Sequence, residues 1–265
     1  MIWIAAYLGA GAAVGFLAGL LGIGGGMTLV PILAALFAAQ ALAPDYGVHL
    51  ALGTGMASMM FTSFVSVRAH HGLGSIDWSL VRRFAPGMLA GALTASLATG
   101  WISERALAMC YALAAGLGAV QMLRRAPTGP ARGLPRPWIS TLVMAGIGAI
   151  CGLMSAGGAF LTVPFMVWCG VPMRSAIGTG AALGWPLAVV GTIGYLLAGL
   201  RVQEALPPYT LGFVLLPALA ALVVTSMLFA PLGARCMHRL PVPTLKRVFA
   251  LLLIALGVKM VVAYW

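Results

Sequence analysis

Two stretches of the sequence resemble each other: GFLAGLLGIGGGMTLVP at residues 15–31 and GAICGLMSAGGAFLTVP at residues 148–164. With a shift of 133 positions, seven of the seventeen residues are identical, including a pair of glycines and a Val-Pro pair. A shorter block follows in the same order, because ALGTG at 51–55 matches AIGTG at 176–180. This ordered self-similarity indicates an internal duplication.

The composition places the duplicated chain in a membrane. Hydrophobic residues make up 62% of the 265 residues, and charged residues only 7%, whereas a soluble domain has about 25% charged residues. At roughly 20 apolar residues per crossing, the chain has material for about eight helical spans. The sequence therefore predicts an all-α, polytopic membrane protein and excludes a water-soluble domain.

Ten apolar runs lie along the chain, five on each side of a basic linker. The linker at 124–137 has four Arg, four Pro and no acidic residue. We expect a first transmembrane repeat at 1–123, a cytoplasmic linker at 124–137 and a second repeat at 138–265. The runs are expected at 3–21, 27–42, 48–67, 84–101, 105–123, 138–155, 159–170, 174–199, 209–231 and 245–264.

The distribution of charge predicts that the second repeat is inverted relative to the first. Basic residues cluster at 68–83 and 124–137 in the first half, and at 235–247 in the second, one element later in the repeat. Basic loops face the cytoplasm. Each half starts with a glycine-broken helix pair that returns the chain to its starting side, and three crossings follow. This odd number makes the copies antiparallel, with both termini outside the cytoplasm.

Other classes of protein fit the sequence less well. The net charge of +11 is better explained by membrane orientation than by nucleic acid, because no basic stretch is interleaved with aromatic residues. The four cysteines are too widely spaced for a metal or redox motif, and we expect no cleavable signal peptide. Motifs of catalysis are absent from the sequence, so we expect no enzyme, no metal and no cofactor. The acids that could relay protons all fall in expected loops: Asp45, Asp77, Glu104 and Glu204.

The two glycine clusters are the first candidate substrate site. They consist of Gly24, Gly25 and Gly26 with their copies Gly157, Gly158 and Ala159. Unwound backbone is tolerated in a membrane only where it is buried in protein or lines a cavity. The helices that start at Met27 and Phe160 would direct free amides and a positive dipole end toward a ligand, so an anion is the expected guest. The alternative is close helix packing, which we prefer for Gly11, Gly15 and Gly19.

Polar residues near the second repeated block complete the candidate site. Thr54 and Thr179 each stand between two glycines in the first turns of a helix, where a hydroxyl can bind a ligand or bond to its own helix. Ser58 lies one turn beyond Thr54, although its counterpart in the repeat is a leucine. His49 and Arg174 precede the two threonines by five residues and are candidate cations on an anion path, or else interfacial anchors.

With these motifs, the chain resembles the TauE/SafE family of sulfite exporters over nearly its whole length. The family pattern G-x-G-G-G-x-x-x-V-P is matched at 22–31, and the later Ala-x-Gly-Thr block is matched at 51–54 and 176–179. The chain departs from the family at Ala159, which replaces a glycine, and at Gly55 and Gly180, where members commonly have Ser.

The resemblance implies a permease or exporter of small sulfur oxyanions, such as sulfite, or of organosulfonates, in the bacterial inner membrane. The expected partners are this anion and membrane lipid. Two alternatives stay open: a transporter of another small anion, such as a carboxylate, and a membrane scaffold that transports nothing.

Overall fold

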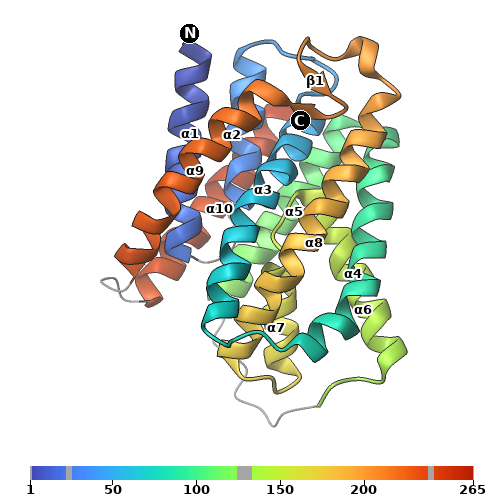
Figure 1. Ribbon diagram of the computed structural model, residues 1–265. Coiled ribbons are helices and arrows are strands. Elements are labelled where there is room, and N and C mark those ends of the chain that lie inside the picture. Colours follow the sequence, from blue (N-terminus) through green and yellow to red (C-terminus); the bar gives the residue numbers. More distant parts are fainter. Residues whose placement is uncertain (1, 22–25, 124–132, 238–241, 265) are drawn as a thin grey trace.

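The computed structural model describes residues 2–21, 26–123, 133–237 and 242–264, which are almost entirely helical (Figure 1). The first half contains α1 (Ile2–Leu21), α2 (Gly26–Ala39), α3 (Gly47–Gly72), α4 (Trp78–Ala98), the short 3-10 helix η1 (Thr99–Trp101) and α5 (Glu104–Leu123). The second half contains α6 (Pro137–Met154), α7 (Ala159–Trp168), α8 (Met173–Leu200), η2 (Gln203–Ala205), α9 (Leu216–Met237) and α10 (Val242–Tyr264). The ten α-helices of the described residues correspond to the ten expected apolar runs.

Two of the expected runs needed correction. The helix expected at 84–101 begins earlier, at Trp78, because Asp77 caps it: the carboxylate accepts the backbone N–H groups of Ser79 and Leu80. The run expected at 209–231 begins with an antiparallel hairpin of two short strands, β1 (Thr210–Leu211) and β2 (Val214–Leu215), which the expectation of helices throughout had missed. Apolarity alone does not distinguish a short buried strand from the start of a helix.

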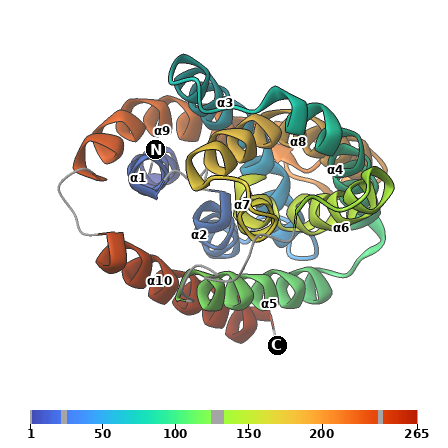
Figure 2. The ribbon, with the colours of Figure 1, turned by 90° about the horizontal axis from the view of Figure 1, so that it is seen from below.

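The helices of the two halves pack in exchanged pairs. The third helices, α3 and α8, pack against each other, and so do the fifth helices, α5 and α10, which form one side of the bundle in Figure 2. The first helix of each half instead packs along the fourth helix of the other: α1 on α9, and α6 on α4. Every helix pair in this arrangement therefore has a counterpart when the halves are exchanged.

Glycines bring the exchanged pairs into close contact. A methyl group on Gly15 of α1 would clash with the backbone of Ser226 on α9, and one on Gly148 of α6 would clash with the backbone of Met88 on α4. We call these contacts the first crossing and the second crossing. Small residues at such contacts let helix backbones approach closely in membranes. The packing role expected of Gly15 is therefore confirmed.

The dimensions and surface of the described helices fit a membrane. Three of them, α3, α6 and α8, are long and apolar enough to cross it, and several others have shorter apolar stretches. The 10 residues of α7 extend about 15 Å at 1.5 Å per residue, half the thickness of the hydrocarbon core. Large apolar side chains such as Leu113 and Leu251 are 69% and 67% exposed. The chain is a multi-pass membrane protein.

Candidate functional site

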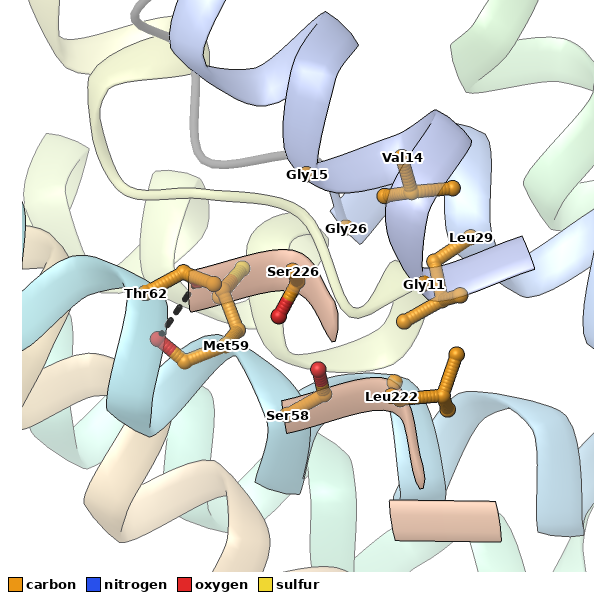
Figure 3. A pocket seen from close by; sticks show the side chains of 11 residues that line it. Gly11, Val14, Gly15, Gly26, Leu29, Ser58, Met59, Thr62, Leu222 and Ser226 are labelled. Atoms are coloured by element: carbon orange, nitrogen blue, oxygen red, sulfur yellow. Dashed lines mark hydrogen bonds between the residues drawn. The ribbon is translucent and has the colours of Figure 1, made fainter. Parts of the chain in front are cut away.

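A small cavity lies at the first crossing, where α1, α3 and α9 meet the first residue of α2 (Figure 3). Its free volume is about 10 Å³, which is room for about one water molecule. The cavity is therefore nearly closed in this conformation. It is lined by Gly11, Val14, Gly15, Gly26, Leu29, Gly55, Ser58, Met59, Thr62, Leu222 and Ser226.

Three hydroxyl side chains supply the polar part of this lining. Ser58 and Ser226 are each only 3% exposed, and Figure 3 shows their hydroxyl groups directed toward each other across the cavity. The Ser226 hydroxyl donates a long bond of 3.3 Å to the Val223 carbonyl, and Thr62 donates one of 3.3 Å to the Met59 carbonyl. The Ser58 hydroxyl has no hydrogen-bond partner among the described residues, and its oxygen opens onto the cavity instead of being fully enclosed by protein. A hydroxyl in this position is able to bind a ligand or a water molecule.

The N-terminal end of α2 contributes a partial positive charge to the cavity. Gly26 is the first described residue of α2 and is buried, and a methyl group on it would clash with the Ser155 carbonyl oxygen. The first amide groups of a helix have no partner within it and carry a partial positive charge. The cavity therefore meets hydroxyl groups on one side and a helix N-terminus on the other, an arrangement suited to a small anion.

Of the residues expected in the substrate site, the cavity brings together Gly26 and Ser58. Gly24 and Gly25 lie outside the described residues. The cavity adds Thr62 and Ser226, which the sequence reading missed. Helical spacing could have found Thr62, because it lies one turn beyond Ser58 on α3. Nothing local marks Ser226, because it comes from the opposite half of the chain and meets Ser58 only through the packing of α9.

Of the copies, Gly157 and Gly158 lie buried at the second break, between α6 and α7, and Ala159 is the half-buried first residue of α7. A methyl group on Gly158 would lie 2.9 Å from the Cα of Gly184 on α8, so this glycine permits a close contact. Ser155 takes the left-handed conformation that ends α6, and its hydroxyl donates to the Leu52 carbonyl at 2.8 Å. This second break therefore joins the two halves through packed backbone.

The counterparts of the cavity residues make the second crossing apolar. The sequence repeat aligns Ser58 and Thr62 with Leu183 and Leu187. Ser226 corresponds to Met88, because these are the residues whose backbone contacts Gly15 and its copy Gly148. Leu183, Leu187 and Met88 are fully buried at 0% exposure. Bulky apolar side chains thus occupy the positions at which the first crossing has three hydroxyls.

Thr54 and Thr179 are fully buried and bind backbone of the opposite half. The Leu215 N–H donates to the Thr54 hydroxyl at 3.0 Å, and the Asp77 N–H donates to the Thr179 hydroxyl at 3.0 Å. Leu215 and Asp77 are the residues directly before α9 and α4. We call these the first and second Gly-Thr clasps. Each hydroxyl thus connects the third helix of one half to the start of the fourth helix of the other.

The preceding glycines make these clasps possible. A methyl group on Gly53 would clash with the Phe213 carbonyl, and one on Gly178 would lie 2.5 Å from the Ser75 carbonyl. In the first clasp the glycine lies against the Phe213 carbonyl and the threonine accepts the Leu215 N–H. In the second clasp the corresponding groups are the Ser75 carbonyl and the Asp77 N–H, so the same spacing of two residues recurs. The Gly-Thr pair therefore recognises the same piece of backbone in both halves.

His49 and Arg174 lie at the starts of α3 and α8, away from the residues that line the cavity. The His49 Nε2 atom bonds to the carbonyls of Thr99 and Ile102 at 3.1 and 3.0 Å, and its ring lies against Phe213. Arg174 is exposed and donates to the Leu73 carbonyl at 3.2 Å. In this conformation both side chains bond to the backbone of connections between helices, and the Nδ1 atom of His49 is buried without a hydrogen-bond partner among the described residues.

Comparisons with known proteins agree with a membrane transporter. The chain matches the family model of the sulfite exporter TauE/SafE over residues 7–260. It is 33% identical over 254 residues to a probable membrane transporter protein of Haemophilus influenzae, with 94% of this chain and 95% of that protein covered. The probable membrane transporter protein YdhB of Bacillus subtilis is 27% identical over 239 residues, with 88% and 89% covered. No solved structure matches the chain.

Proposed function

Because the chain belongs to the sulfite exporter TauE/SafE family, we propose that it moves small sulfur-containing anions, such as sulfite or organosulfonates, across a bacterial inner membrane. The family and the similar proteins identify it as a membrane transporter. The observation that carries the proposal is the Ser58 hydroxyl, which is buried at 3% exposure without a partner and faces a cavity at a helix N-terminus. We propose Gly26, Ser58, Thr62 and Ser226 as its substrate-binding residues; Gly24 and Gly25 lie outside the described residues, and their role stays a prediction from the sequence.

We further propose that the two halves are inverted-topology repeats. The exchanged pairing of α1 with α9 and of α6 with α4 supports this, as do the two matching Gly-Thr clasps. In Figure 1 the chain enters α1 and α6 from opposite ends of the bundle. Inverted repeats with broken helices near the membrane midplane are a common architecture of secondary transporters.

Charge supports a cytoplasmic position for the end of the bundle that holds the α3–α4 connection. The elements that meet at this end carry Arg68, Arg82, Arg83, Arg136 and Arg174 with one acid, Asp77, whereas those at the opposite end carry Arg105 and Arg201 with the acids Asp45, Glu104 and Glu204. An excess of arginine is typical of a cytoplasmic face. Both chain termini would then be outside the cytoplasm. In a cysteine-free background, a single cysteine at exposed Leu211 should react with an impermeant thiol reagent in sealed cells, and one at exposed Leu73 should not. The reverse labelling would contradict this topology.

The cavity volume implies that transport needs a conformational change. A space for about one water molecule cannot hold sulfite, so the helices around it must separate to admit a substrate. We propose that α1 and α9 move together relative to α2 and α3, because α1 packs mainly on α9. Such gating of one helix group against another is how alternating access is achieved in many transporters.

A liposome flux assay tests the proposed function. Purified protein in sealed vesicles should carry labelled sulfite, and Ser58→Ala should weaken the apparent affinity by about tenfold to a hundredfold, the value of a hydrogen bond to a charged ligand. Ser96→Ala is the matched control, because Ser96 is equally buried but its hydroxyl donates to the Ala92 carbonyl of its own helix at 2.7 Å.

The same assay distinguishes the alternatives. Flux of succinate without flux of sulfite or taurine would identify a carboxylate transporter. No flux of any of these, from correctly inserted protein, would favour a scaffold over a transporter.

A further inference from the structure

We infer that the cavity at the first crossing selects anions that carry a single negative charge. This inference rests on the proposed function and concerns the same site. It predicts that hydrogensulfite and monosulfonates are substrates, whereas sulfate and other doubly charged anions of similar size are rejected.

The described lining of the cavity contains no charged side chain. Its polar groups are the neutral hydroxyls of Ser58, Thr62 and Ser226. Neither α2 nor the described part of α1 contains a charged residue. The helices that line the cavity carry their cations at a distance: Arg68 follows Ser58 by ten residues on α3, and Arg235 follows Ser226 by nine residues on α9. At 1.5 Å per residue these backbone positions are about 15 Å and 13 Å away.

The N-terminal end of α2 is therefore the positive group nearest to a bound ion. A helix N-terminus is equivalent to roughly half an elementary charge, which compensates a large part of one negative charge but a small part of two. The solvation cost of moving an ion out of water grows with the square of its charge, and buried charges without a partner are strongly disfavoured. Neutral hydroxyl donors reduce this cost without removing it.

The buried Ser58 hydroxyl is an independent sign that this helix end receives a ligand. It lacks a partner among the described residues, and it faces the cavity that Gly26 lines. A hydroxyl can donate a single hydrogen bond, and those of Thr62 and Ser226 are used in long bonds of 3.3 Å to their own helices. When these two hydroxyls exchange their long bonds for the ligand, Ser58, Thr62 and Ser226 together donate three. The three oxygens of a monosulfonate or of hydrogensulfite match this number, and their single charge matches the absence of a side-chain cation.

The titratable groups of the same helices lie away from the cavity lining. They are Tyr7 on α1, His49, His70 and His71 on α3, and, further along α3 and α9 than the cavity-lining residues, Arg68, Arg235 and Cys236. A change of transport with pH can therefore be assigned to the anion and not to the protein, if it occurs with an anion that changes its charge and not with anions that keep theirs. Sulfite changes from a single to a double charge near neutral pH, methanesulfonate stays singly charged, and sulfate stays doubly charged.

The test is competition against labelled sulfite in vesicles that contain the intact protein, one pH unit below and one unit above the second pKa of sulfite. Between these conditions the singly charged fraction falls about tenfold, and the apparent affinity for sulfite should fall by about the same factor. Inhibition by methanesulfonate should stay constant. Sulfate, which has the same size and shape as methanesulfonate, should inhibit about a hundredfold less at both pH values.

A pair of variants tests the physical cause. Thr62 is the half-buried residue among the three hydroxyls of the cavity lining, so it is the position chosen for a longer side chain. Thr62→Lys adds the missing cation and should improve inhibition by sulfate by about tenfold or more, whereas Thr62→Gln, of similar length without charge, should not. If Thr62→Lys fails to insert, the comparison of the three anions on the unmodified protein decides.

Three results would overturn the inference. Sulfate that competes as well as methanesulfonate would show that charge is not selected, and the proposed function would survive. Sulfate that remains excluded from a well-inserted Thr62→Lys protein would show that rejection has a cause other than charge. Absence of sulfite flux in every condition would remove the proposed function and the inference together.

Discussion

The two crossings of the molecule have the same backbone arrangement and different side chains. At the first crossing Gly15 lies against the backbone of Ser226, and at the second Gly148 lies against the backbone of Met88. The first has hydroxyls around a small cavity, and the second has Leu183, Leu187 and Met88, all fully buried. The duplicated helix contact has therefore been kept in both halves while its interior has diverged.

The difference shows how one scaffold can provide both stability and binding. Buried leucine and methionine side chains fill space and stabilise the helix packing, and methionine adapts well to irregular gaps. Buried hydroxyls without partners destabilise the packing unless a ligand or water satisfies them. On this basis we propose that the second crossing is the structural copy and the first crossing is the binding copy.

The largest effect is expected when the first crossing receives the side chain of the second. Ser226→Met would place in the first crossing the residue that stands at the equivalent position in the second, and so fill a cavity that holds about one water molecule. Flux of sulfite in vesicles should fall by more than about a hundredfold, because a filled site cannot accept the anion.

A matched change on the same helix serves as the control. Leu228→Met introduces methionine two residues further along α9, at a position that is 65% exposed, and it should leave flux within about twofold because exposed substitutions away from the site are nearly neutral. Normal flux through a correctly inserted Ser226→Met protein would show that the substrate takes another path.

The next largest effect should come from emptying the second crossing. Met88→Ala removes a fully buried side chain, and truncation of a core methionine costs about 2–5 kcal/mol of folding stability. The melting temperature in detergent should fall clearly, while the affinity of the remaining folded protein for the substrate should be unchanged. A large loss of affinity without a loss of stability would assign the second crossing to the substrate path and erase the proposed distinction.

The sequence alone could predict the helices and the repeat, because both depend on local patterns. Ten apolar runs gave ten helices, and the match between 15–31 and 148–164 anticipated the break between α6 and α7, whereas its counterpart at 22–25 lies outside the described residues. The clasps could not be predicted, since Thr54 meets Leu215 from 161 residues away. The sequence showed that a hydroxyl between glycines would be buried, but a repeated motif has the same appearance whether it recognises a ligand or the backbone of the other half.

The two Gly-Thr clasps provide a comparison in which both copies should behave alike. Thr54→Val and Thr179→Val keep the shape of the side chain and remove the oxygen that accepts the Leu215 or Asp77 N–H. Loss of a partner for a buried N–H costs about 1–3 kcal/mol, and the larger loss is expected for Thr54→Val, because Leu215 is more deeply buried than Asp77.

Thermal unfolding and substrate affinity should be measured together on these variants. Thr54→Ser and Thr179→Ser retain the hydroxyl and should recover most of the stability. If the valine variants melt normally but bind substrate tenfold more weakly or worse, these hydroxyls belong to the substrate site that the sequence first suggested.

The smallest effect concerns the side chains of the threonines' partners, Asp77 and Leu215, where the copies differ again. Asp77 caps α4 with its carboxylate, whereas the equivalent Leu215 before α9 has no polar side chain. The Ser79 hydroxyl, together with the Leu80 and Ser79 N–H groups, holds the pKa of the Asp77 carboxyl below its ordinary value. A lowered pKa in the folded state means that the carboxylate form stabilises the fold, so this contribution is fully present above the unfolded pKa of about 3.9 and disappears as the pH falls through the folded value.

Asp77→Ala should therefore cost about 0.5–2 kcal/mol at neutral pH, the usual value of an N-cap, and its difference from the unmodified protein should shrink in acid. Melting temperatures of both proteins across this pH range provide the measurement. Glu204→Ala is the control, because Glu204 is exposed and has no hydrogen bond among the described residues. A deficit of Asp77→Ala that stays constant down to the lowest pH at which the protein folds would mean that the carboxylate does not cap α4, and that the second clasp alone fixes where this helix begins.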